Sequence, residues 1–104
     1  MITLFRRLFR NGPDVKYASL VANGALIVDV RSAGEYQDGH IKGSLNIPLE
    51  TLRRNLAVLS KDRTIITCCA SGMRSATASN ILKEHGFTNV YNGGGWISLQ
   101  NKMR

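Results

Sequence analysis

Two short apolar runs constrain the fold of this chain most strongly. Residues 25–30, "ALIVDV", and 64–69, "TIITCC", are nearly continuous in apolar and β-branched residues. Such runs are typical of strands in a parallel sheet that is covered on both faces. Each is followed by a segment with helical features, and strands that alternate with helices build an α/β domain. Because 104 residues suffice for one core, we expect one small parallel sheet flanked by helices on both faces.

The remaining elements follow from periodicity and end signals. "PDVKYASLVANG" predicts a helix that Asp14 caps and Gly24 ends. Ser32 and Glu35 have the spacing of a capping box, which predicts a second short helix. The leucines of "LETLRRNLAVLS" recur every three or four residues and predict an amphipathic helix. We further expect short strands in "LNIP" and "NVY", a glycine loop after the latter, and helices over "SATASNILKEHG" and "WISLQNKM".

We expect residues 1–12 to form a separate amphipathic segment ahead of a domain at residues 13–104. Leu4, Phe5, Leu8 and Phe9 share one helical face, the arginines lie elsewhere, and "NGP" breaks the pattern. The segment either folds onto its own domain or touches a membrane surface or a partner through residues 1–10. The first alternative is favoured because ten residues bind membranes poorly alone. "MITLFRRLFR" has no signal-peptide pattern, since arginines interrupt its apolar residues.

The net charge and the cysteines limit which partners and which cellular location are expected. The net charge of +7 favours anionic partners. The sequence has no basic stripe interleaved with aromatic residues, so nucleic-acid binding is not expected. Cys68 and Cys69 are adjacent, which is poor geometry for a disulfide, so two reduced thiols and a cytoplasmic location are expected. With no C-x2-C pair and only two histidines, no metal site is expected. We expect a monomer.

The segment "CASGMRS", residues 69–75, follows one strand and opens a helix. Ligands of parallel sheets gather at such strand ends. Main-chain N–H groups turned inward there form an anion-binding nest, which would stabilise a thiolate at Cys69 and make it a nucleophile. Gly72 would allow the tight turn, and Arg74 would add charge or brace the loop by hydrogen bonds to its carbonyls. The candidate site is Cys69 as nucleophile with a cradle of Ala70, Ser71, Gly72, Met73 and Arg74.

Strand alternation separates the two cysteines. If Cys69 opens into the loop, Cys68 should point to the opposite face of the sheet. We therefore expect Cys68 to be a small buried core residue, rather than a second thiol that resolves a product of Cys69.

Three segments together resemble the rhodanese-like (sulfurtransferase) domains. "LIVDVRSAGEYQDGHIKGSLNIPL" is similar to the first motif of that family, "ITCCASGMRSATASNILKEHGF" to its active-site segment, and "VYNGGGW" to its closing motif. The resemblance implies transfer of sulfane sulfur, without a cofactor, from thiosulfate, polysulfide or a protein persulfide. Cys69 would carry the sulfur as a persulfide and pass it to a thiophilic acceptor, such as cyanide or an acceptor protein. It also implies that Asp29, Arg31 and His40 support the fold.

Alternatives to this enzyme remain open. Many family members that turn over thiosulfate rapidly have a basic residue within the loop, whereas residues 70–73 here are Ala, Ser, Gly and Met. A non-catalytic persulfide carrier or binding module would need the same thiolate and cradle. A cysteine phosphatase or arsenate reductase is less favoured, because those loops have the spacing C-x5-R and Cys69 to Arg74 is C-x4-R.

Overall fold

Four parallel strands form the centre of the part of the chain that the computed structural model describes, residues 15–104. The strands are β1 (Leu26–Asp29), β2 (Leu45–Asn46), β3 (Ile65–Cys69) and β4 (Val90–Gly95). Their order across the sheet is β2-β1-β3-β4, and every neighbouring pair is parallel. The expected parallel sheet is confirmed. The predicted segment at residues 1–12 and the cap at Asp14 lie outside the described residues, and the boundary between residues 12 and 13 stays a prediction.

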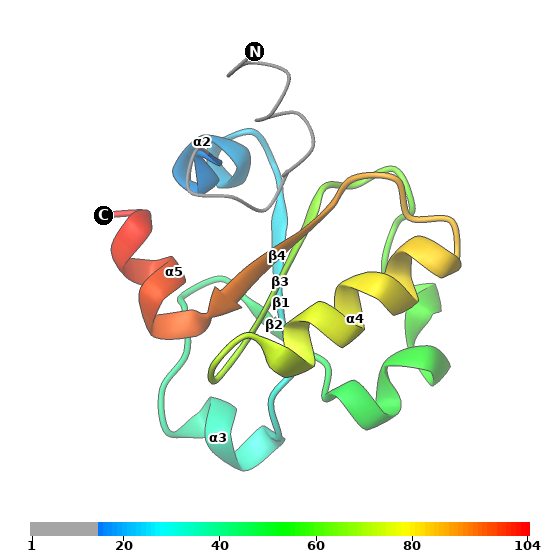
Figure 1. Cartoon of the computed structure of the whole chain (residues 1–104), viewed down its shortest axis with the longest axis horizontal. Helices are drawn as coiled ribbons and strands as arrows, with labels where there is room; N and C mark the ends of the chain where they lie inside the picture. The colour runs from blue at the N-terminus through cyan, green and yellow to red at the C-terminus, as the bar shows by residue number, and fades with distance from the viewer. Residues whose placement is uncertain (1–14) are drawn as a thin grey trace.

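Helices cover both faces of the sheet, as expected (Figure 1). On one face lie α2 (Tyr17–Ala22) and α5 (Trp96–Lys102). On the other lie α4 (Met73–Glu84) and two 3₁₀ helices, η1 (Leu49–Arg54) and η2 (Leu56–Val58). The short helix α3 (Ala33–Gln37) lies beyond the carboxyl end of β1. Because helices cover both faces of the sheet, the carboxyl ends of the strands are where a ligand site is expected.

Each face of the sheet has its own apolar cluster. Ile65 and Cys69 of β3 belong to the cluster beneath α4, with Leu82 and Leu52. Ile66 and Cys68 of the same strand belong to the cluster beneath α2 and α5. This division follows from strand geometry, since successive side chains point to opposite faces. The expected placement of Cys68 in the core, opposite to Cys69, agrees with this arrangement.

The helix predicted over "LETLRRNLAVLS" is wrong in type. The segment forms η1 and η2, which Asn55 separates with non-helical backbone angles. In an α-helix the Asn55 N–H would donate to the Thr51 carbonyl, but here the Asn55 side-chain amide donates to that oxygen at 2.8 Å. The Asn55 N–H donates to the Leu52 carbonyl instead. The leucines still face the core, since Leu52 and Leu59 are buried there and Leu49 and Leu56 pack against it.

Three other expectations concern the ends of helices and strands. The capping box of Ser32 and Glu35 is present at the start of α3. Helix α2 begins after Lys16, which provides no side-chain cap, and ends before Gly24, whose φ is +102°. The glycines after "NVY" form no loop but continue β4 to Gly95. A side chain at Gly93 would lie 2.9 Å from Ile66, Leu99 and the Thr67 carbonyl, so only glycine lets β4 lie this close to β3.

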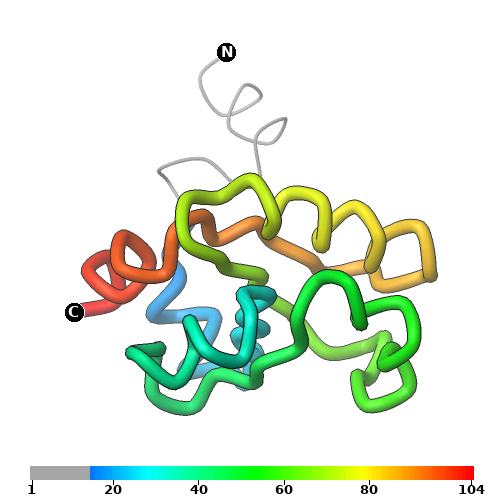
Figure 2. Tube along the Cα trace, turned by 90° about the horizontal axis from the view of Figure 1, so that it is seen from below, coloured from blue at the N-terminus to red at the C-terminus, as the bar shows by residue number. Residues whose placement is uncertain are grey.

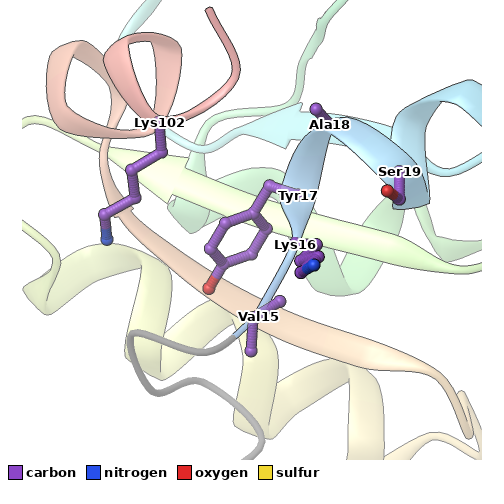
Figure 3. A pocket seen from close by; sticks show the side chains of 6 residues that line it. All are labelled: Val15, Lys16, Tyr17, Ala18, Ser19 and Lys102. Atoms are coloured by element: carbon purple, nitrogen blue, oxygen red, sulfur yellow. The ribbon is translucent and has the colours of Figure 1, made fainter.

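No helix within residues 15–104 is long and apolar enough to cross a membrane. A surface pocket of about 380 Å³ lies beside α2 and α5 (Figure 3). Its lining includes Lys16, Tyr17 and Lys102, and the Lys102 ammonium lies 5.8 Å from the centre of the Tyr17 ring. This pocket is on the face of the sheet opposite to α4.

Candidate active site

Cys69 is the last residue of β3, and the chain turns there into α4 (Figure 2). Gly72 precedes the helix with a φ of +108°, which a residue with a side chain adopts only at a cost. This turn directs main-chain N–H groups at the Cys69 sulfur, with Gly72 N at 3.0 Å and Ser75 N at 3.3 Å. The Ser75 hydroxyl oxygen lies 3.5 Å from the same sulfur. The sulfur thus lies at the N-terminus of a helix of 12 residues, where negative charge is stabilised.

The two cysteines have opposite electrostatic environments. Burial raises the pKa of the Cys69 thiol, but hydrogen bonds from the Ser75 hydroxyl and from the N–H groups of Ser75, Gly72 and Ser71 outweigh it. The pKa of Cys69 is therefore lower than that of an ordinary thiol. Burial raises the pKa of Cys68 to about 12, and the Asp29 carboxylate adds to this effect. The structure thus stabilises the thiolate of Cys69 more than that of an ordinary cysteine, and it keeps Cys68 a thiol at neutral pH.

Arg74 braces the loop instead of turning inward. Its guanidinium donates to both carboxylate oxygens of Glu35, at 2.7 and 3.0 Å, and so joins the start of α4 to α3. This pairing lowers the pKa of Glu35 to about 2, with help from the Ser32 N–H. Bidentate pairs of this kind fix geometry as well as charge. Of the two roles expected for Arg74, its contacts support bracing, but through the ion pair with Glu35 and not through the expected hydrogen bonds to loop carbonyls.

A hydrogen-bond chain leads from the sulfur to β4. Ser75 is fully buried, and its hydroxyl oxygen lies 2.6 Å from Oδ1 of Asn92 and 3.0 Å from the Gly72 carbonyl. Oδ1 of Asn92 also accepts from the Gly94 N–H at 3.0 Å. In addition, the Asn92 carbonyl accepts from the Tyr17 hydroxyl at 3.2 Å. Both Ser75 and Asn92 are absent from the set of site residues predicted from the sequence.

The glycine segment of β4 shapes the other side of the loop. A Cβ atom on Gly95 would lie 2.9 Å from the Ala70 carbonyl oxygen. A Cβ on Gly72 would lie 3.5 Å from the Gly94 Cα. Glycine at Gly95 therefore allows β4 to pass against the loop at backbone distance, and the two segments hold each other in place.

The predicted cradle residues occupy different positions around the sulfur. Gly72 donates to it directly at 3.0 Å, and the Ser71 N–H contributes to the lowered pKa of Cys69. Ala70 and Ser71 are exposed at the rim, and the Met73 side chain is 80% exposed. Cys69 itself is only 1% exposed. The sulfur thus lies beneath exposed loop residues.

The residues expected to support the fold do so by direct contacts. Arg31 and Asp29 form a buried ion pair at 2.7 Å. Arg31 also donates to the carbonyls of Glu35 and Gly39, and its guanidinium lies 4.8 Å from the centre of the Trp96 ring. His40 stacks on Tyr36 with ring centres 3.7 Å apart. Trp96 is half-buried against the cluster beneath α2 and α5.

Within residues 15–104, no three histidine, cysteine or acidic side chains come together as metal ligands. The pocket in Figure 3 lies on the other face of the sheet and contains no cysteine or histidine. The loop around Cys69 is therefore the candidate active site.

The fold and the site define a parallel α/β domain with a cysteine sulfur held by N–H donors of a short loop at the N-terminus of a helix. The sequence model of the rhodanese-like domain family matches residues 14–101. This chain belongs to the rhodanese-like domain family.

Relatives differ in size and in described activity. Thiosulfate sulfurtransferase PspE of Escherichia coli is 40% identical over 70 residues, which cover 65% of this chain and 67% of that protein. A solved structure described as rhodanese with anions from E. coli is 38% identical with a TM-score of 0.64, covering 72% of this chain and 91% of that one. The tRNA uridine(34) hydroxylase of Hamiltonella defensa is 37% identical over 79 residues, covering 70% of this chain but only 22% of the hydroxylase.

Proposed function

We propose that this protein is a sulfurtransferase that moves sulfane sulfur through a persulfide on Cys69. The observation that carries the proposal is the set of N–H donors from Gly72 and Ser75 on the Cys69 sulfur. They lower the pKa of Cys69 despite its burial, and a thiolate is the form of cysteine that attacks. The family and the similarity to thiosulfate sulfurtransferase PspE support the same reaction class.

The proposed reaction has two displacement steps. The Cys69 thiolate attacks the outer sulfur of the donor, and the donor's sulfur–sulfur bond breaks. The leaving group departs with the electron pair, as sulfite when thiosulfate is the donor. The terminal sulfur of the resulting persulfide is then attacked by a thiophilic acceptor such as cyanide. Thiocyanate leaves and the Cys69 thiolate returns, as in double-displacement catalysis.

The charges around the loop bear on the donor. Thiosulfate is a dianion, but residues 70–73 carry no positive side chain and the Arg74 guanidinium is paired with Glu35. A polysulfide spreads its charge along a chain of sulfur atoms and a protein persulfide carries a single charge, so both need less positive charge at the loop than thiosulfate does. We therefore propose that these donors react faster than thiosulfate. We also propose a reducing, cytoplasmic location, which the free thiols of Cys68 and Cys69 support.

Three other functions have weaker support: a phosphatase or arsenate reductase, a hydroxylase and a persulfide carrier. The loop has four residues between Cys69 and Arg74, and the pairing of Arg74 with Glu35 leaves its guanidinium poorly placed to bind a phosphate or arsenate. The hydroxylase activity of the tRNA uridine(34) hydroxylase belongs to a protein of which this chain spans 22%, so it is not proposed for this chain. A persulfide carrier stays the nearest alternative, because it needs the same thiolate.

Thiocyanate formation from cyanide tests the proposal. The protein would be assayed with thiosulfate and, separately, with polysulfide, with Cys69→Ser as the control. Multiple turnovers with either donor, faster with polysulfide and absent in Cys69→Ser, are expected. A single sulfur transferred per protein, without further turnover, would instead identify a carrier. Equal activity of Cys69→Ser would refute the role of Cys69.

A further inference from the structure

The Ser75 hydroxyl lies at a junction between the reacting sulfur and β4. Its oxygen is within 2.6 Å of Asn92 Oδ1, 3.0 Å of the Gly72 carbonyl and 3.5 Å of the Cys69 sulfur. A hydroxyl group has one proton to donate. Asn92 Oδ1, the Gly72 carbonyl and a Cys69 thiolate are all acceptors, so they compete for that single proton.

The orientation of the Asn92 amide is fixed by its neighbour. The Gly94 N–H donates to Oδ1 at 3.0 Å, so this atom is the amide oxygen and cannot donate to Ser75. At 2.6 Å it is also the nearest acceptor to the Ser75 hydroxyl. The bulge in β4 makes this contact: Asn92 pairs with Thr67 and Gly95 with Cys69, so β4 has one more residue than β3 across this interval.

Two arrangements of the hydroxyl proton follow. When Cys69 is a thiol, its S–H donates to the Ser75 oxygen and the Ser75 proton goes to Asn92. When Cys69 is a thiolate, the sulfur can only accept, so the Ser75 proton must leave Asn92 to stabilise it. The N–H groups of Gly72 and Ser75 donate to sulfur in both states, whereas the hydroxyl must change partner.

We infer that Asn92 is a positioning residue that holds the Ser75 hydroxyl proton away from Cys69 and thereby limits how much of Cys69 is thiolate. This inference rests on the proposed role of Cys69 as the reacting thiolate. Asn92 belongs to the closing motif of the chain. This motif would therefore act on the reacting sulfur through Ser75, which is 17 residues from Asn92 in the sequence.

The charged groups near Cys69 are the same in wild type and in the alanine variants of the test. Arg74 of α4 is paired with Glu35 of α3, and Asp29 at the end of β1 is paired with Arg31. Cys68 is the adjacent titratable group on β3. The sequence of β4 contains no charged residue, and the charged residues of η1 are exposed. A changed reactivity of Cys69 therefore reports the hydrogen-bond chain.

The test is the rate of alkylation of Cys69 by iodoacetamide as a function of pH, followed by intact mass. Cys69→Ser should give no adduct, which assigns the reaction to Cys69. Asn92→Ala should lower the apparent pKa of Cys69 by roughly half a unit to one unit, a three- to tenfold higher thiolate-to-thiol ratio. Ser75→Ala should raise it, because the hydroxyl donor is lost. Asn80→Ala, an exposed position on α4, is the matched control and should not move it.

A double-mutant cycle separates positioning from a structural effect. If Asn92 acts through Ser75, Asn92→Ala should have no effect on the apparent pKa in the Ser75→Ala background. An unchanged or raised pKa in Asn92→Ala, or a lowering that persists without the Ser75 hydroxyl, would overturn the inference.

If Asn92→Ala does not fold by circular dichroism, Asn92→Asp is used in its place, because it keeps the acceptor for the Gly94 N–H. It should raise the pKa by a larger amount with Ser75 present than with Ser75→Ala, and equal shifts would overturn the inference.

The measurement follows the thiolate and not sulfur transfer. Failure of the proposed function would appear as normal alkylation without transfer from any donor. Failure of this inference would appear in the alkylation profiles whether or not sulfur is transferred.

Discussion

Two adjacent cysteines of this chain have different chemistry because they point to opposite faces of one strand. Cys69 has hydrogen-bond donors on its sulfur and a lowered pKa. Cys68 is fully buried in the opposite cluster, with a pKa of about 12. The environment of each residue, rather than the residue type, decides which of them reacts.

This difference predicts opposite outcomes for two serine variants. Cys69→Ser should abolish persulfide formation while leaving the fold intact. Cys68→Ser should retain most sulfur transfer and lose about 1–3 kcal/mol of stability, because a hydroxyl replaces a thiol in an apolar cluster. Transfer assays and urea unfolding of both variants check this. Loss of transfer in a folded Cys68→Ser protein would show that Cys68 takes part in the reaction.

At the scale of elements, the loop after β3 is held from two sides. Helix α3 holds it through the ion pair of Glu35 with Arg74, and β4 holds it through the close approach of Gly95 to Ala70. The position of the loop therefore depends on α3 and β4, which are far from it in the sequence. The contact with each of them can be removed separately.

Gly95→Ala tests the contact with β4. Its Cβ would lie 2.9 Å from the Ala70 carbonyl oxygen, so the loop must shift, at a cost of about 1–3 kcal/mol. Because the shift displaces donors from the sulfur, we expect transfer activity to fall at least tenfold. Gly34→Ala in α3 is the control, since nothing lies within 4 Å of its Cβ and alanine favours a helix. Equal activity of the two variants would mean that the contact does not position the loop.

The ion pair with α3 predicts a defined pH dependence of stability. The folded pKa of Glu35 is about 2 and its ordinary value is 4.5. The stabilisation is therefore fully present above pH 4.5 and is lost as the pH falls toward about 2. Thermal unfolding of wild type and Glu35→Gln should differ most at neutral pH and converge in acid. A difference that is unchanged across this range would show that the carboxylate is not the cause.

The comparison between sequence and structure is most informative at this scale. The apolar runs and the capping box predicted β1, β3 and α3, because local pattern and burial agree there. The helix predicted over the leucines was wrong, because the Asn55 amide takes the Thr51 carbonyl, a local competition that the apolar period does not reveal. Ser75 follows the predicted loop directly, and its place in the first turn of α4 could have indicated it. Asn92 was missed because the glycines that follow it were interpreted as a loop, whereas they continue β4 through the bulge that brings Asn92 to Ser75.

At the scale of the whole molecule, the parallel sheet explains where the chemistry lies. All strands end at one edge, so the motif after β1, the loop after β3 and the glycines at the end of β4 meet there. The net charge of +7 favours anionic donors in general, whereas the loop itself is lined by small neutral residues. The net charge thus favours anions in general, and we expect the loop to determine which donor reacts.

The most direct test of this account is the intact mass of the reduced protein after incubation with thiosulfate or with a polysulfide. We expect a gain of one sulfur, about 32 Da, that cyanide reverses and that Cys69→Ser lacks. The reason is that a thiolate stabilised by N–H donors should form the persulfide. The gain should be larger with polysulfide than with thiosulfate. No adduct from either donor, with Cys69 still reactive toward iodoacetamide, would contradict sulfur transfer as the function of this site.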